Sequence, residues 1–86
     1  MRFITHIHLE GGRRLEHISR VRWRDGLMTG TSTRQQMVEW IEDGGDARVQ
    51  ALPVDARVEV VNARPAYLRS APNGSVVDNL LSLPEF

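Results

Sequence analysis

The fold of this chain is decided near its start by residues 3–24, which read FITHIHLEGGRRLEHISRVRWR. Apolar and polar residues alternate on both sides of a glycine pair, and this period of two predicts half-buried strands over residues 1–10 and 15–24. Gly11, Gly12 and Arg13 form the predicted hairpin turn, because glycine reaches positive φ at little cost. The register that follows pairs four residues of each strand: Leu9 with Leu15, Ile7 with His17, Thr5 with Ser19 and Phe3 with Val21.

A helix is the next predicted element, after a turn-rich connection over residues 25–30. Ser32 is a favourable N-cap, and Gln35 three residues later completes a capping-box pattern. Gly44 and Gly45 end the helix, as glycine commonly does just past the last turn. The apolar stripe that should face the sheet consists of Met37, Val38, Trp40 and Ile41.

The second half of the chain reads as short strands over residues 47–52, 57–61 and 66–70, with a bend at 62–65 and a turn at 72–75. The last nine residues, 78–86, carry four large apolar side chains, so we expect this tail to dock on the body. We therefore predict a single α+β domain over residues 1–86, ββα followed by two or three strands. Its one helix packs on a mostly antiparallel sheet.

The C-terminal half carries the most specific motifs of the chain. Residues 67–70 read YLRS, Asn73-Gly74 forms a turn, and residues 79–84 read NLLSLP. With the preceding strands and helix, they make the chain resemble the domain of unknown function 3892 family along nearly its whole length. The bend at 63–66 departs from the glycine-containing turn expected there. The resemblance implies a small α+β protein of bacterial or phage origin, and it transfers no catalytic residue.

Composition restricts the classes of function. The chain has 86 residues, with 11 arginines, no lysine, 11 acidic residues and no cysteine. A net charge of zero argues against a nucleic-acid binder driven by overall charge, and the lack of cysteine excludes disulfides, thiol nucleophiles and thiolate zinc sites. No apolar run reaches about 18 residues, and polar alternation begins at once. We therefore expect neither a transmembrane helix nor a signal peptide, and a cytoplasmic location.

The main candidate binding feature is an arginine-rich face of the predicted hairpin. Arg20, Arg22 and Arg24 alternate with Val21 and Trp23, so their side chains share the outer side of the sheet. In the predicted register two isoleucines also point outward there. The predicted interaction face consists of Arg20, Arg22, Arg24, Ile4, Ile18, His6 and His8, with Arg2 beside them.

This mixed apolar and basic surface favours a protein partner of unknown identity. Nucleic acid held by the same arginines is the alternative, and a solvated outer face is the simplest interpretation. Nucleic acid is less favoured because the face is predicted to have no aromatic residue that could stack on bases. An enzyme is the third hypothesis; no nucleophile–base pair emerges, so no catalytic residue and no cofactor are expected. No membrane partner is expected, and exposed strand edges are compatible with a homodimer.

Three further groups of residues have structural interpretations. His6 and His8 match a metal-ligand spacing, but His17 faces away from them in the predicted register, so no metal site is expected. The helix start, residues 30–34, offers N–H groups and hydroxyls to an anion, yet a capping box accounts for it. A structural anchor should hold the tail, with Arg69 pairing with Asp78 or the terminal carboxylate. Its members are Tyr67, Leu68, Arg69, Asn79, Leu80, Leu83 and Pro84.

Overall fold

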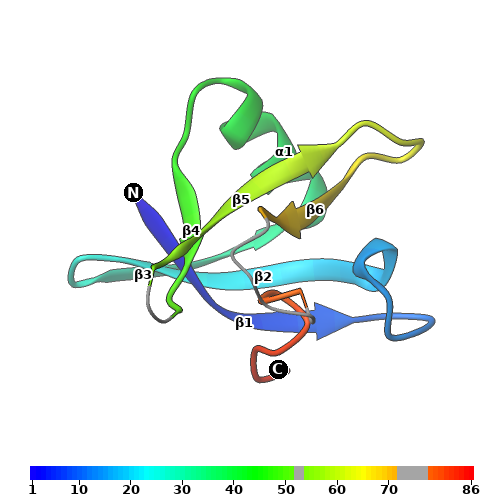
Figure 1. Ribbon diagram of the computed structural model, residues 1–86, viewed down its shortest axis with the longest axis horizontal. Helices are drawn as coiled ribbons and strands as arrows, with labels where there is room; N and C mark the ends of the chain where they lie inside the picture. Colours follow the sequence, from blue (N-terminus) through cyan, green and yellow to red (C-terminus); the bar gives the residue numbers. More distant parts are fainter. Residues whose placement is uncertain (52–53, 72–77) are drawn as a thin grey trace.

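One α-helix packs on a six-stranded mixed sheet in the computed structural model, which describes residues 1–51, 54–71 and 78–86 (Figure 1). Within these ranges the strands are β1 (Arg2–Leu9), β2 (Ile18–Asp25), β3 (Met28–Thr33), β4 (Ala47–Val49), β5 (Ala56–Val61) and β6 (Tyr67–Ser70). Helix α1 (Arg34–Glu42) follows β3, and a short 3-10 helix, η1 (Leu15–His17), precedes β2. The strand order is β3-β2-β1-β4-β5-β6, and only β1 and β4 pair in parallel. The predicted α+β class is confirmed.

The β1–β2 hairpin forms as predicted, but the predicted register is wrong. Ile7 pairs with Val21 rather than His17, and Leu9 pairs with Ile18. The predicted three-residue turn is replaced by a longer connection that contains η1. A Cβ on Gly12 would meet the His17 ring at 2.5 Å, so this connection packs too closely for a side chain at that position.

Two irregularities in the β1–β2 ladder change which side chains face the helix. On β1, Thr5 is an extra residue between Ile4 and His6, whose partners Trp23 and Arg22 are adjacent on β2. On β2, Ser19 is an extra residue between Ile18 and Arg20, whose partners Leu9 and His8 are adjacent on β1. Each extra residue shifts the alternation by one position, as a β-bulge does. Both are held by their hydroxyls, since Thr5 donates to the Arg22 carbonyl at 3.2 Å and Ser19 donates to the His8 carbonyl at 3.3 Å.

The bulges bury residues that strict alternation places outside. Ile4 and Ile18 were expected to point outward, yet their exposed fractions are 2% and 0%. They join Ile7, Val21 and Trp23 on the inner face of the sheet, the side covered by α1. The expectation of an outward Ile4 and Ile18 is therefore wrong, because the hairpin does not keep one period of two along its length.

Residues 25–30 were expected to form a connection, but most of them belong to a β2–β3 hairpin. Gly26, at φ +60°, begins a two-residue loop that returns the chain into β3. A Cβ on Gly30 would meet the Trp23 ring at 2.4 Å, so glycine is required where that ring lies across β3. The strand was missed because it is polar and at the edge of the sheet, where alternation is weak.

Helix α1 begins one residue later than expected. Its N-cap is Thr33, whose hydroxyl accepts from the Gln36 N–H at 3.2 Å, while the Gln36 side chain accepts from the Thr33 N–H at 2.9 Å. Ser32 instead lies buried in β3 and accepts a hydrogen bond from Trp23 Nε1 at 3.0 Å. The predicted end at Gly44 is confirmed by its φ of +102°. Across the described ranges, no helix is long and apolar enough to cross a membrane.

The C-terminal half forms β4, β5 and β6, and the tail then returns to β1 (Figure 1). The Ile7 N–H donates to the Pro84 carbonyl at 2.9 Å, and the Phe86 N–H donates to the Ile7 carbonyl at 3.0 Å. Leu80 is 0% exposed in the core. The predicted turn at 72–75 and the end of the predicted strand at residue 52 lie outside the described residues.

Candidate functional site

The outer face of the β1–β2–β3 sheet carries an aligned group of basic side chains. Arg20, Arg22 and Arg24 are all exposed on β2. The ladder places His8 beside Arg20 and His6 beside Arg22 on β1. Because residues paired across a sheet share a face, these five side chains form one surface, here called the arginine face. The structure therefore brings these five predicted residues together.

On β3, the strand on the other side of β2, threonines flank the arginine face. Thr33, Thr31 and Thr29 of β3 stand opposite Arg20, Arg22 and Arg24. Thr29, Thr31 and Thr33 are exposed, and their small side chains leave the guanidinium groups accessible above the sheet. The surface is therefore polar and basic over three strands.

The other predicted members of this face lie elsewhere. Ile4 and Ile18 are in the core, so neither can contact a partner at this surface. Arg2 points to the helix side, where its guanidinium carbon lies 4.0 Å from the Trp23 ring centroid and 4.1 Å from that of Trp40. Stacking between two indole rings holds this cation in a structural position.

Two aromatic rings stand at the arginine face although none was predicted there. The guanidinium carbon of Arg22 lies 4.5 Å from the Phe86 ring centroid, and that of Arg24 lies 5.5 Å from the Phe3 ring centroid. Phe86, at the end of the tail, is held at the face by His8. His8 Nδ1 donates to the Phe86 carbonyl oxygen, and the centroids of the His8 and Phe86 rings lie 5.7 Å apart. No local pattern identifies Phe86, because it is 78 positions from His8.

Within the described residues, the three arginines of the arginine face have no carboxylate partner. Among the described residues, no carboxylate oxygen lies within 4.0 Å of the Arg20, Arg22 or Arg24 guanidinium. At the edge of the face, Glu10 Oε1 lies 3.4 Å from His8 Nε2. Three exposed guanidinium groups are thus free to donate to an anion.

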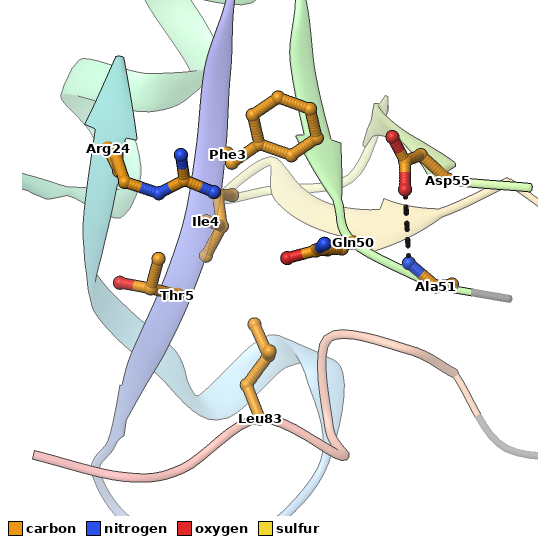
Figure 2. Close-up of a pocket in the computed structure, with 8 residues that line it drawn as sticks. All are labelled: Phe3, Ile4, Thr5, Arg24, Gln50, Ala51, Asp55 and Leu83. Atoms are coloured by element: carbon orange, nitrogen blue, oxygen red, sulfur yellow. Dashed lines mark hydrogen bonds between the residues drawn. The ribbon is translucent and has the colours of Figure 1, made fainter. Parts of the chain in front are cut away.

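A cavity of about 710 Å³ adjoins this face where β1 and β4 separate. Figure 2 shows the Phe3 ring and the Leu83 side chain at opposite sides of the space, with the Gln50 amide between them. Asp55 Oδ1 accepts from the Ala51 N–H at 3.2 Å on the far wall. Sequence patterns could not indicate this cavity, since its walls come from separate strands and the tail. Its lining residues are Phe3, Ile4, Thr5, Arg24, Gln50, Ala51, Asp55 and Leu83.

His17 and the helix start take structural positions. His17 lies in η1, away from the β1 histidines, and its Nδ1 accepts from the Arg14 N–H at 3.1 Å. No cluster of three or more potential metal ligands occurs in the part of the chain that the structure describes. At the helix start, Arg34 Nη1 donates to the Glu16 carbonyl at 2.6 Å, so this guanidinium is used within the fold.

The tail is anchored by Asp78 and Ser70 rather than by Arg69. The Asp78 carboxylate accepts from the Ser70 N–H at 3.0 Å, the Ser70 hydroxyl at 2.7 Å and the Leu80 N–H at 2.8 Å. Arg69 is exposed, and its Nε lies 3.7 Å from Glu59 Oε1 on β5, so the expected pair with Asp78 is wrong. Arg69 cannot reach Asp78 because successive strand residues point to opposite faces.

The other predicted anchor residues have varied surroundings. Leu68 is fully buried, as Leu80 is, and Leu83 packs partly buried against the core. The Asn79 N–H donates to the Ser70 hydroxyl at 3.0 Å. Tyr67 begins β6 opposite Val61 and is partly buried. Pro84 contributes through its carbonyl group, which accepts from the Ile7 N–H.

These features define a small α+β domain whose single helix covers one side of a mixed sheet, with a basic surface and a cavity on the other. The chain belongs to the family described as Protein of unknown function (DUF3892), whose model matches residues 3–84. This match confirms the family to which the YLRS and NLLSLP motifs pointed. No curated protein and no solved structure matches the chain.

Proposed function

We propose that this domain binds single-stranded nucleic acid on its arginine face. The observation that carries the proposal is the row of three exposed guanidinium groups on β2 without a carboxylate partner among the described residues. Alternate residues of a strand are about 7 Å apart, so an extended phosphate backbone along β2 would meet one guanidinium after another. His6 and His8 lie beside this row on β1.

Two features favour nucleic acid over a protein partner. The preference for a protein rested on an apolar contribution from Ile4 and Ile18, and both are buried. The preference against nucleic acid rested on the lack of an aromatic side chain, and Phe3 and Phe86 both lie at the face. Aromatic rings beside basic side chains are typical of surfaces that bind single strands, because every base offers a flat face for stacking.

The zero net charge of the chain does not oppose this proposal, because the charges are separated in space. Glu39, Glu42 and Asp43 are exposed at α1, which covers the inner side of the sheet. The arginine face is on the outer side. A screening length of about 10 Å at moderate ionic strength limits how strongly charges on one side affect a ligand on the other.

The test is fluorescence anisotropy with a labelled single-stranded oligonucleotide of mixed sequence, titrated over a range of salt concentrations. Single-strand binding loses about 0.7 log units of affinity per log unit of salt for each phosphate contacted, so three contacts predict a slope of about −2. The double variant R20E/R22E should weaken binding at least about tenfold, because it replaces two cationic donors with carboxylates that repel the phosphates. The matched control is R57E/R64E, which reverses two exposed arginines outside the face.

The outcomes separate the two classes of partner. Equal loss in both double variants, or no oligonucleotide binding by the unmodified protein, would overturn the proposal. Binding of a poly-glutamate peptide without binding of the oligonucleotide would also overturn it and would favour an acidic protein. Circular dichroism of each variant checks that the fold is retained.

A further inference from the structure

We infer that the cavity beside Arg24 holds one base of the bound strand and prefers a base with an exocyclic amino group. This inference rests on the proposed function, and it assigns base recognition to a cavity next to the phosphate-binding row, which shares Arg24 with it. A volume of about 710 Å³ lies within the range of about 300–1,000 Å³ typical of small-molecule sites.

The topology explains why a cavity lies at this position. β1 and β4 pair only through Arg2 with Ala47 and Phe3 with Arg48, and beyond these pairs the strands separate. Further along β1 the tail takes the place of a strand, with an isolated bridge between Ile7 and Glu85. The space between the end of β4 and the start of the tail contact is therefore left open on the outer side.

The cavity is continuous with the arginine face. Arg24 belongs to the row on β2 and also lines the cavity, and Figure 2 shows its side chain extending across β1 beside Phe3. Its guanidinium carbon is 5.5 Å from the Phe3 ring centroid. A phosphate held by Arg24 would therefore place the attached nucleoside next to the cavity mouth.

The walls suit a flat heterocycle. Phe3 offers an aromatic ring on one side and Leu83 offers an aliphatic side chain on the other, with open space between them (Figure 2). Both are partly buried, so they are held by the fold while each presents some surface to the cavity. A base entering here would stack on Phe3 and be covered by Leu83.

The polar side chains that line the cavity could form hydrogen bonds with the edge of a base. The Gln50 amide is directed into the space and carries both a donor and an acceptor (Figure 2). Asp55 uses Oδ1 for the Ala51 N–H, and its second carboxylate oxygen has no partner among the described residues. A carboxylate only accepts hydrogen bonds, so it favours a base with an amino group, such as cytosine, over thymine. Thr5 contributes little, since its hydroxyl donates to the Arg22 carbonyl.

The experiment compares three labelled strands of equal length: a deoxycytidine oligomer, a deoxythymidine oligomer and an abasic phosphodiester. We expect affinity to fall in that order. Asp55→Asn should remove the preference for cytosine over thymine. Gln50→Ala should weaken binding of the deoxycytidine oligomer about threefold to tenfold, as for the loss of one or two hydrogen bonds. Neither variant should change abasic binding.

Gln35→Ala is the matched control, because Gln35 is exposed on α1, away from the cavity. A direct readout is the side-chain amide resonance of Gln50 in a 15N–1H correlation spectrum, which should shift with the deoxycytidine oligomer and not with the abasic strand. Equal affinity for all three strands, with R20E/R22E still weakening binding at least about tenfold, would overturn the base site and leave the proposed function standing. If none of the strands binds, the proposed function fails and this inference fails with it.

Discussion

At the scale of single residues, the clearest electrostatic feature is the pair formed by Asp46 and Arg48. Arg48 Nε donates to Asp46 Oδ1 at 3.0 Å and Nη2 donates to Oδ2 at 3.3 Å, so the contact is bidentate. The Arg48 hydrogen bonds hold the pKa of the Asp46 carboxyl below its ordinary value of 3.8, against the opposing effect of burial. The Asp46 carbonyl also accepts from the Arg2 N–H at 2.9 Å, so the pair lies where β1 meets β4.

This pair predicts a difference in acid stability. Because the folded state lowers the pKa of Asp46, the stabilisation is present above the ordinary value of 3.8 and is lost as the pH falls through the lower folded value. Arg48→Gln removes the charged partner of Asp46. The difference in free energy of unfolding between the unmodified protein and this variant should therefore become smaller as the pH is lowered. Urea unfolding at a series of pH values measures that gap. A gap that stays constant below pH 3.8 would contradict the assignment.

At the scale of elements, the sequence predicted the class of the fold better than its details. Two strands, a helix with its glycine end, and the apolar tail follow from periodicity and caps. The bulges at Thr5 and Ser19 do not, because an extra residue looks like ordinary alternation until its partner strand is known. The same limit applied to the site: alternation on β2 identified Arg20, Arg22 and Arg24, whereas Ile4 and Ile18 were misplaced by the bulges.

The start of α1 gives a second prediction, which separates two adjacent hydroxyl residues. Thr33→Ala removes the cap on the Gln36 N–H and should cost about 1 kcal/mol. Ser32→Ala leaves the buried Trp23 indole N–H without its acceptor and should cost about 1–3 kcal/mol. Ser32→Ala alone should also shift the tryptophan fluorescence spectrum of the folded protein. Urea unfolding supplies the free energies, and an unchanged spectrum with equal losses would argue that Ser32 does not hold Trp23.

At the scale of the whole molecule, the two halves of the sheet are joined by little direct pairing. β1 and β4 share two residue pairs, so the sheet alone gives a narrow connection between β1–β3 and β4–β6. The core is nevertheless one cluster that includes Ile7 and Val21 from one half and Val58 and Leu68 from the other. Leu80 of the tail belongs to the same cluster, and the tail also hydrogen-bonds to β1 and to Ser70 of β6. The tail therefore connects the halves that the strands connect only weakly.

This arrangement predicts that one tail residue controls the stability of both halves. Leu80→Ala removes a fully buried side chain and should lower the free energy of unfolding by about 2–5 kcal/mol, whereas Leu81→Ala, at a partly buried neighbour, should cost less. Unfolding should remain one transition, with tryptophan fluorescence from Trp23 and Trp40 coinciding with far-ultraviolet circular dichroism of the whole sheet. If Leu80→Ala left the urea midpoint of the fluorescence transition unchanged, the tail would be an appendage rather than part of the shared core. Two separate transitions in Leu80→Ala would instead mean that β1–β3 and β4–β6 can each stay folded when the other has unfolded.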